Sequence, residues 1–494
     1  MEFASLFFLY RILPLIMILY VVFPDVGRRN ILLLAAGMLL YAMGQPVYLL
    51  LLVVLSWVTF NLAKKMKRGH RRGLLLPLIL NLAVLLVLKY VDPILLSVGI
   101  GTESGGVLLG LWAKAVDAVN GMGFSFRVPE SLAPLGFSFY ILGVSAYLID
   151  IYRGKHPAEK QFSSFLLYVF FFPKLFQGPV VRYGQIRLQL KERHDSERNL
   201  FEGATRVVTG LGKKVLLADV CGRMIAEMAE SGSNLALTGS WLTAVLYMFR
   251  IYYDFSAACD LAVGFGRMFG FKLPENFNLP YTAMSVTEFF ERWNLTFRSF
   301  IKDYIHDPLR GDSESPLHGF VVLLISVLVG SLWHGGSFIF LIWGAYLLIV
   351  MMIEKFCDGF LTSLPYWLRH VLTVLALLFG WVIFASPSVE SLAVTLKAMI
   401  GDGGVGILGD GQRVWNSIPL IAACWFGVTS LPRRIRIFIR NRCDMLGKQS
   451  PAGQLTHWRI AYLALSFVYV LVVLWWVTVF GAGAPVQPSI FMHL

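Results

Sequence analysis

The run Phe338-Ile-Phe-Leu-Ile-Trp-Gly-Ala-Tyr-Leu-Leu-Ile-Val-Met-Met-Ile353 decides the fold class, because no charged side chain interrupts it. About 18–20 apolar residues in a helix cross a bilayer, and this run approaches that length. Further predominantly apolar runs are Leu6–Pro24, Pro46–Ala63, Leu74–Leu88, Phe320–Trp333, Val371–Ala385 and Ile460–Val479. The chain is therefore predicted to be an all-α polytopic membrane protein.

The composition agrees with this prediction. Of the 494 residues, 57% are hydrophobic and only 15% are charged, whereas a soluble domain is nearer a quarter charged. The mean hydropathy is +0.66. We expect one integral membrane domain with roughly 11 transmembrane helices, together with re-entrant and interfacial helices. It divides into N-terminal helices (1–160), a central region (161–355) and C-terminal helices (356–494).

The net charge of +13 is concentrated in short segments beside apolar runs. One segment holds Lys64, Lys65, Lys67, Arg68, Arg71 and Arg72, and the other holds Arg433, Arg434, Arg436, Arg440 and Arg442. Basic loops of this kind mark the cytoplasmic side of a membrane protein and argue against nucleic-acid binding. With these segments and an Arg28–Arg29 loop inside, both the N-terminus and the C-terminus are predicted to be extracytoplasmic.

The centre of the chain departs from simple spans. The segment Phe162–Pro173 is apolar but too short to cross alone, so we expect a re-entrant or interfacial segment. The segment Leu273–Arg310 is too polar to span, although apolar runs surround it. Polar backbone at membrane depth survives only inside protein or beside a water-filled cavity. This segment is therefore the first indication of a site.

Two carboxylates, Asp254 and Asp260, follow the expected span Leu237–Tyr252, next to Tyr253. An intramembrane carboxylate faces the protein interior and has a partner. Two interpretations stay open: a structural role, in which each aspartate pairs with a basic residue or caps a helix, and a role in a substrate path. The five scattered cysteines form no CxxC pair, so neither a disulfide framework nor a metal site is predicted.

A capping pattern opens the next helix. Ser285 is followed three residues later by Glu288, which predicts a helix over Val286–Phe300. Glu288 and Arg292 are spaced four residues apart, as in an ion pair along a helix. We expect this amphipathic helix to lie at the cytoplasmic face.

His334 lies in Gly330-Ser-Leu-Trp-His-Gly-Gly336, directly after an apolar run. It is the only histidine set deep among the expected spans. Two readings stay open: a satisfied core histidine, or a general base, since imidazole can accept a proton near neutral pH. The flanking Gly335 and Gly336 would let a substrate approach the backbone closely.

Several segments together resemble the membrane-bound O-acyltransferase (MBOAT) superfamily. The segments are Pro134–Tyr140, Phe172–Tyr183, Tyr252–Ser256, Met268–Tyr281, Ser285–Asn294 and Leu332–Gly335. The likeness is to the bacterial branch that O-acetylates alginate, cellulose and peptidoglycan, and more distantly to teichoic acid D-alanyl transferases.

This resemblance implies helices around a central tunnel, with the catalytic core within 161–355. It implies that His334 is the catalytic histidine and that Asn294 is a second polar residue of the site. The alginate-type proteins usually have His after Arg-Trp, and Asn294 cannot act as a base. We expect His334 to take the proton and Asn294 to orient the acyl carbonyl or donate to the oxyanion. Trp293 and Trp333 would wall the tunnel, although plain packing explains them equally well.

The resemblance also implies acetyl transfer from acetyl-CoA, with no permanently bound cofactor, to an extracytoplasmic polysaccharide. It implies a bacterial inner-membrane location among lipids, an SGNH-type extracytoplasmic partner and a polysaccharide biosynthesis machinery. The alternatives are D-alanyl transfer from a carrier protein, a lipid-modifying enzyme of the superfamily, and a transporter or polysaccharide conduit. Transporters often contain internal repeats, and none is visible in this sequence.

Overall fold

The computed structural model describes residues 4–66, 68–69, 71–97, 100, 106–121, 123, 132–175, 177–193, 196–406, 410–448 and 455–483. Within these ranges every regular element is a helix, and there is no strand. The all-α prediction is therefore confirmed.

Helices of membrane-spanning length and hydropathy occur along the chain. In the described residues, six qualify by length and composition: α2 (Val26–Gly44), α3 (Pro46–Lys64), most of α4 (Arg71–Ser97), α17 (Phe338–Phe356), α19 (Tyr366–Ala385) and part of α23 (Leu455–Gly483). A bent pair, α21 (Asp410–Val428) with α22 (Leu431–Lys448), could add a seventh. Three shorter apolar helices cover Phe8–Val22, Phe137–Tyr152 and Pro316–Leu332. The chain is thus a multi-pass membrane protein, and the expected number of roughly 11 spans is not confirmed.

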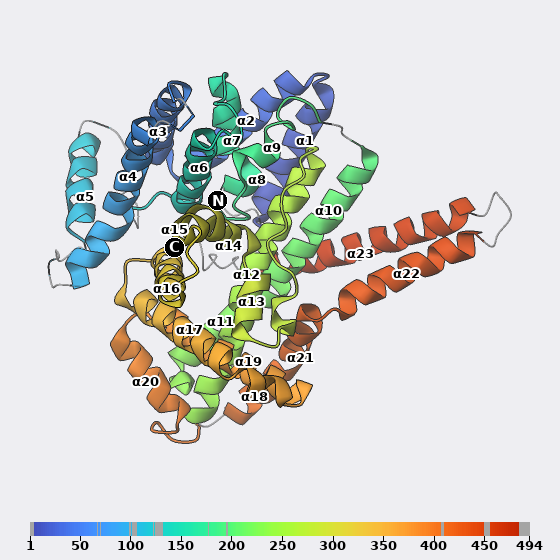
Figure 1. The fold of residues 1–494 in the computed structure, drawn as a ribbon. Helices are drawn as coiled ribbons and strands as arrows, with labels where there is room; N and C mark the ends of the chain where they lie inside the picture. Colours follow the sequence, from blue (N-terminus) through green and yellow to red (C-terminus); the bar gives the residue numbers. More distant parts are fainter. Residues whose placement is uncertain are drawn as a thin grey trace.

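The N-terminal elements form one end of the molecule, coloured blue to blue-green in Figure 1. Besides α2–α4 they are η1 (Phe8–Ile12), α1 (Leu13–Val22), α5 (Val107–Asn120), α6 (Phe137–Tyr152), α7 (Phe162–Phe170), α8 (Phe172–Leu175) and α9 (Tyr183–Ile186). As expected from its length, the short α7 does not span; it is buried against α2 and α3. Gly37 of α2 allows this contact, because a side chain there would collide with the backbone carbonyl of Phe170.

The long helix α12 (Leu237–Met268) runs through the middle of the molecule (Figure 1). It packs against α10 (Glu197–Gly212), η2 (Lys213–Ala218) and α11 (Asp219–Glu230). Short elements lie nearby: η3 (Ser233–Leu235), η4 (Pro280–Thr282), α13 (Val286–Arg292), α14 (Leu295–Ile301), η5 (Lys302–His306) and α15 (Asp307–Arg310). The expected span Leu237–Tyr252 is thus only the first half of a helix that also carries Asp254 and Asp260.

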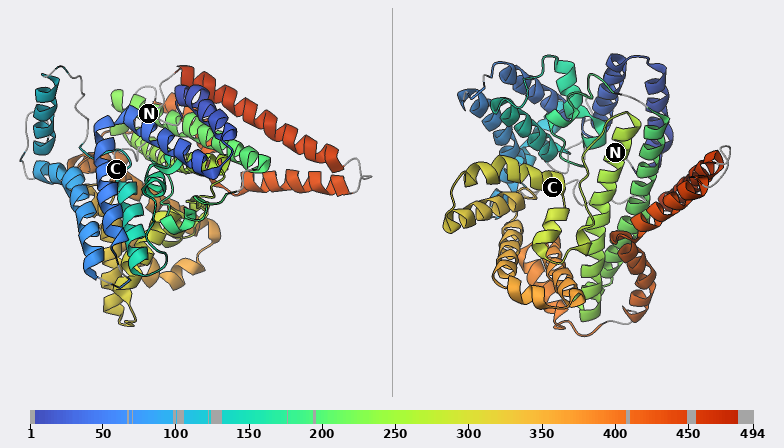
Figure 2. Two further views of the ribbon diagram at one scale, coloured as in Figure 1. Left: turned by 90° about the horizontal axis from the view of Figure 1, so that it is seen from above. Right: turned by 45° about the vertical axis from the view of Figure 1, so that its right-hand side comes forward.

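The C-terminal elements form the opposite end in Figure 1, coloured yellow to orange. They are α16 (Pro316–Leu332), α17, α18 (Asp358–Ser363), α19 and α20 (Val389–Met399), followed by α21. Helices α22 and α23 pack against each other and project away from the body in both Figure 1 and Figure 2.

Two basic segments that were expected to be loops are helical. Arg28 and Arg29 lie in the first turn of α2, because the Asp25 carboxylate accepts from the Arg28 amide and caps the helix. The Arg433–Arg442 segment lies within α22. Arg28 and Arg29 thus lie at the start of the candidate span Val26–Gly44, and the first part of the second segment lies within the bent pair.

Candidate functional site

The predicted helix Val286–Phe300 begins where expected but is broken in the middle. The Ser285 hydroxyl accepts from the Glu288 amide at 2.9 Å, and the Glu288 carboxylate accepts from the Met284 amide at 2.7 Å. The capping pattern therefore sets the start of α13. The helix ends at Arg292, Asn294 adopts a left-handed conformation with φ 46°, and α14 starts afresh. The prediction of one continuous helix is wrong.

A loop from earlier in the chain causes this break. The Asn278 amide donates to the Arg292 carbonyl at 3.0 Å, and the Leu295 amide donates to the Asn276 carbonyl at 3.0 Å. The Asn276 side-chain oxygen accepts from the Thr296 amide at 3.0 Å and from the Thr296 hydroxyl at 2.7 Å. These bonds satisfy the backbone groups that a helix break leaves exposed. Hydrogen bonds from this earlier loop therefore hold the corner between α13 and α14 in place.

His334 lies in the turn between α16 and α17, surrounded by aromatic rings. Its ring centroid lies 6.2 Å from that of Phe297, 5.4 Å from Trp343, 5.3 Å from Phe384 and 6.3 Å from Phe340. These rings come from α14, α17 and α19. Elements far apart in the sequence thus surround one imidazole, and His334 is partly buried among them.

The two glycines after His334 serve this packing. A side chain on Gly335 would collide with the Phe340 ring, and one on Gly336 would lie 3.2 Å from the Tyr90 ring. The sequence suggested that these glycines admit a substrate. In the structure they admit neighbouring aromatic side chains.

Helix α4 holds the same turn from the other side. The Lys89 amine donates to the Trp333 carbonyl at 2.6 Å and to the Ser138 hydroxyl at 3.1 Å. The adjacent Tyr90 hydroxyl donates to the Leu332 carbonyl at 2.8 Å. Sequence reasoning did not single out Lys89, although a lysine inside an apolar run was a usable signal.

The structure brings the Trp293–Asn294 corner and His334 into one aromatic cluster. Trp293 lies 5.1 Å from Trp381, Trp381 lies 6.3 Å from Trp343, and Trp343 contacts His334. Asn294 is half-buried and directly precedes α14, the helix that contacts the His334 ring. The imidazole of His334, which can accept a proton, and the side-chain amide of Asn294, which can donate a hydrogen bond, therefore belong to the same group of helices.

The other tryptophan candidate and the two aspartate candidates have different surroundings. Trp333 is half-buried, and its ring is tilted against that of Phe297 with the centroids 6.0 Å apart. Asp254 is buried and pairs with Lys214 at 2.9 Å. Asp260 is buried and pairs with basic residues of α10 and η2. Both aspartates are therefore ion-paired, which is one of the two interpretations that the sequence left open.

The remaining candidates also have defined partners. The Tyr253 hydroxyl donates to the Cys424 carbonyl of α21 at 2.5 Å. Arg292 pairs with Glu288, as the spacing predicted, and donates to the Thr282 hydroxyl at 2.8 Å. Among the described residues, no three His, Cys, Asp or Glu side chains form a group that could hold a metal ion.

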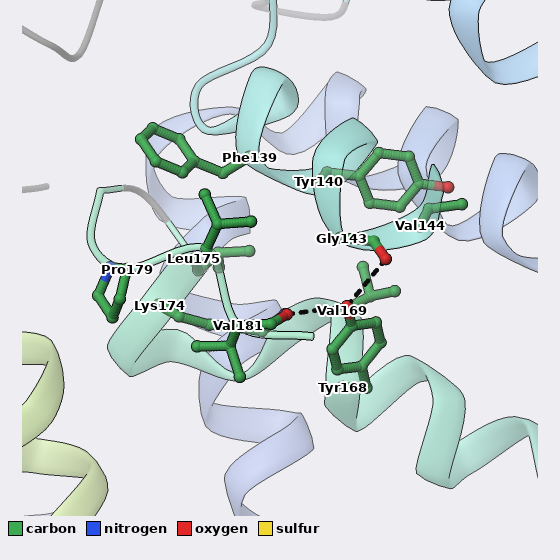
Figure 3. A pocket seen from close by; sticks show the side chains of 11 residues that line it. Phe139, Tyr140, Gly143, Val144, Tyr168, Val169, Lys174, Leu175, Pro179 and Val181 are labelled. Carbon is green, nitrogen blue, oxygen red and sulfur yellow. Dashed lines mark hydrogen bonds between the residues drawn. The ribbon is translucent and has the colours of Figure 1, made fainter. Parts of the chain in front are cut away.

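A small cavity lies between α6, α7, α8 and the segment 179–181 (Figure 3). Its volume is about 20 Å³, room for about one water molecule. The Tyr168 hydroxyl bonds to the carbonyls of Gly143 and Val181 at 3.0 Å each, and the Lys174 amine lies 3.8 Å from the Tyr168 ring centroid. This cavity is too small to be the expected tunnel, which stays a prediction.

These features define a multi-pass membrane protein in which helices enclose a histidine turn and a polar corner. The family model of MBOAT, the membrane-bound O-acyltransferase family, matches residues 156–393. The chain belongs to this family and is an O-acyltransferase.

Named relatives agree with this assignment. The chain is 32% identical to a probable alginate O-acetylase AlgI of Pseudomonas syringae pv. tomato, over 82% of this chain and 76% of the relative. It is 29% identical to a peptidoglycan O-acetyltransferase of Helicobacter pylori, over 76% and 74% of the two chains. A teichoic acid D-alanyltransferase of Bacillus subtilis is 21% identical over 45% of this chain and 59% of its own.

Proposed function

We propose that this O-acyltransferase transfers acetyl from cytoplasmic acetyl-CoA across the bacterial inner membrane, for O-acylation of an extracytoplasmic polysaccharide. The observation that carries the proposal is the His334 turn, where one imidazole is enclosed by aromatic rings beside the corner that carries Asn294. The relatives named alginate O-acetylase and peptidoglycan O-acetyltransferase support a small acyl group and a polysaccharide acceptor.

Acyl transfer needs a base, an oxyanion donor and exclusion of water. The acceptor hydroxyl attacks the thioester carbonyl while His334 takes its proton. The carbon–sulfur bond then breaks, and the protonated imidazole returns the proton to the leaving thiolate. The Asn294 amide would donate to the oxyanion, and loss of one such donor typically lowers the rate about 10²–10³-fold.

A group of basic side chains around Tyr304 supports an anionic donor. The ring centroid of Tyr304 lies 5.3 Å from the Arg153 guanidinium, 5.6 Å from the Lys155 amine and 5.0 Å from the Arg182 guanidinium. These residues come from the end of α6 and the start of α9. Positive charge of this kind attracts phosphate groups such as those of coenzyme A.

A fourth basic residue, Arg68, lies beside the same group. Its Nε would lie only 2.6 Å from a side chain placed on Gly154. Two carboxylates partly balance the group: Asp150 pairs with Lys155 at 3.1 Å, and Asp303 pairs with Arg182 at 2.6 Å. Four basic side chains against two carboxylates leave an excess of positive charge for a phosphate.

One short stretch of chain links this basic group with the reaction centre. Phe300 lies 4.9 Å from Tyr304, and Phe297, one turn earlier, contacts His334. From Asn294 to Tyr304 the helical rise is roughly 15 Å, comparable with an extended phosphopantetheine arm. A donor with its phosphates at Tyr304 could therefore bring its thioester to the His334 turn.

The remaining parts of the proposal concern the two sides of the membrane. The basic segments are placed in the cytoplasm and both termini outside, as the distribution of Lys and Arg favours. The acceptor side would be served by an SGNH-type partner and the polysaccharide machinery. The D-alanyltransferase relatives keep D-alanyl transfer from a carrier protein as the second candidate.

The test is acyl transfer by the purified protein in lipid, with radiolabelled acetyl-CoA and His334→Ala beside the wild type. We expect transfer by the wild type and a loss of at least 10²-fold in the variant. Equal transfer by a folded His334→Ala protein would refute the mechanism. Transfer only from a D-alanyl carrier protein would refute the acetyl-CoA donor and establish the alternative.

A matched experiment examines the basic group. Arg182→Gln with Arg153→Gln should raise the KM for acetyl-CoA at least 10-fold and leave the rate with acetyl-pantetheine, which lacks phosphates, unchanged. The exposed Arg198, which pairs with Glu202, provides the control variant Arg198→Gln. Equal effects on both donors would contradict phosphate binding at Tyr304.

A further inference from the structure

A lysine that the proposed mechanism does not use lines the small cavity between α6, α7 and α8 (Figure 3). Lys174 is half-buried, and its amine lies 3.8 Å from the Tyr168 ring centroid. Within the described residues, this amine makes no hydrogen bond and no ion pair. A lysine amine has three N–H donors, and a cation among apolar side chains is costly unless its donors are used. Lys174 therefore suits a ligand that brings an acceptor oxygen into the cavity.

The walls and the size of the cavity decide which acceptor fits. None of the described lining residues is acidic, and the Tyr168 hydroxyl is already bonded to the carbonyls of Gly143 and Val181. The volume of about 20 Å³ takes one oxygen-sized group, whereas a phosphate with all its oxygens needs more room. A neutral carbonyl oxygen is the acceptor that matches both the walls and the volume.

The cavity adjoins the stretch of chain that the proposed function gives to the acyl donor. Its wall residue Val180 belongs to one hydrophobic cluster with Tyr304, the centre of the basic group. Phe297, which contacts His334, packs against the same cluster. The Val180 amide also donates to the Thr296 hydroxyl at 2.8 Å, in the first turn of α14. One wall of the cavity is therefore shared with the segment that links the basic group to the reaction centre.

We propose that the Lys174 amine binds a carbonyl oxygen of the acyl donor's pantetheine arm in this cavity. The proposal rests on the proposed function, in which the arm runs from Tyr304 to the His334 turn. The arm carries amide carbonyls and ends in the thioester carbonyl, and each of these is a neutral acceptor of the required size. Lys174 thus holds the arm, while the phosphates stay with Arg153 and Arg182. A carrier protein presents its acyl group on the same kind of arm, so the proposal applies to either donor.

Three variants of the full-length protein in lipid test this contact. Lys174→Met removes the amine and keeps an unbranched side chain. Lys397→Met is the matched control, because it removes the same charge from α20, where the lysine is exposed. Arg182→Gln with Arg153→Gln provides the comparison for phosphate binding.

The readout is the Kd for two analogues in which a methylene replaces the thioester sulfur, so that no transfer occurs. One is the analogue of acetyl-CoA and the other that of acetyl-pantetheine. Lys174→Met should weaken the binding of both about 10-fold or more, because a hydrogen bond from a charged group is lost. The double arginine variant should weaken only the coenzyme A analogue, and Lys397→Met neither. If Lys174 only packs on Tyr168, folded Lys174→Met keeps both wild-type Kd values, and that result overturns the proposal.

A second measurement needs only the wild type and keeps the proposal testable if Lys174→Met does not fold. Cyanate carbamoylates lysine amines, and peptide mass spectrometry follows the labelling of Lys174 and of the exposed Lys397. Both analogues should slow the labelling of Lys174 and leave that of Lys397 unchanged. Equal labelling of Lys174 with and without the analogues overturns the proposal.

Acyl transfer from acetyl-CoA, measured on the same samples, separates this contact from the proposed function. Transfer by the wild type, with unchanged Kd values in Lys174→Met, counts only against the role of Lys174. Weaker binding by Lys174→Met, with no transfer by the wild type, supports the contact and counts only against the proposed function. A wild type that binds neither analogue overturns the contact.

Discussion

The substitution Asn276→Leu tests whether the corner between α13 and α14 is essential for the reaction. Asn276 is 1% exposed, and its side-chain oxygen accepts both the amide and the hydroxyl of Thr296. The Thr296 hydroxyl in turn accepts from the Val180 amide at 2.8 Å. One amide side chain thus ties a loop, the start of α14 and the segment before α9 together.

The magnitude follows from the groups left without partners. Leucine keeps the approximate size of asparagine but accepts no hydrogen bond, so two buried donors of Thr296 lose their acceptor. Each unsatisfied buried donor costs about 1–3 kcal/mol, which gives roughly 2–6 kcal/mol in all. Because Asn294 lies two residues before Thr296, the start of α14 should shift. A displacement of about 1 Å at a reacting group can lower the rate about 10²-fold.

Two measurements follow the substitution in lipid: the thermal unfolding midpoint and kcat for acyl transfer. We expect a lower midpoint and a kcat reduced by about 10²-fold. Asn278→Ala is the matched control, since Asn278 is exposed and contributes its backbone amide to the same corner. It should leave both quantities near the wild-type values. A folded Asn276→Leu protein with wild-type kcat would refute the claim that this corner positions the reaction.

Two further predictions concern buried charge. Lys214→Met leaves Asp254 and Asp219 buried without their shared lysine, so the free energy of unfolding should fall by about 3–5 kcal/mol. Thermal unfolding measures this loss. A triple variant that combines Lys214→Met with Asn at both aspartate positions should recover much of it. Burial raises the pKa of Glu159, but hydrogen bonds from the Tyr183 hydroxyl and backbone amides outweigh it and lower the pKa below its usual value. A carboxylate with a lowered pKa stabilises the fold at neutral pH and loses this contribution in acid, so the stability difference between wild type and Glu159→Gln should shrink below roughly pH 4. A difference that is constant from pH 7 to pH 3 would contradict this.

The spans could be predicted from the sequence because their physical cause is local. An uninterrupted apolar run such as Phe338–Ile353 has one stable setting, a helix in lipid, and the structure forms α17 there. The boundaries were less predictable. The sequence predicted a loop at Arg28 and Arg29, but the Asp25 side chain caps α2 and both residues lie in its first turn. A cap is a single hydrogen bond, and apolar periodicity does not reveal it.

The site could be predicted only in part, because its geometry depends on long-range contacts. The Ser285 cap is local and was predicted correctly. The break at Asn294 depends on Asn276, which precedes it in a separate loop. The contact between Lys89 and Trp333 joins residues 244 positions apart, and no local pattern reports it. Motif resemblance selected His334, but it gave no information on what surrounds that ring.

The turn that carries His334 is held by residues outside the matched family segment as well as inside it. The matched family segment covers 156–393, so it contains His334 and its aromatic neighbours on α17 and α19. It does not contain α4, whose Lys89 and Tyr90 bond to the two carbonyls that precede His334. A general base must be held within a small distance of its working position, because misplacement lowers the rate steeply. Helix α4 therefore contributes directly to the geometry of the turn that carries His334, the proposed general base.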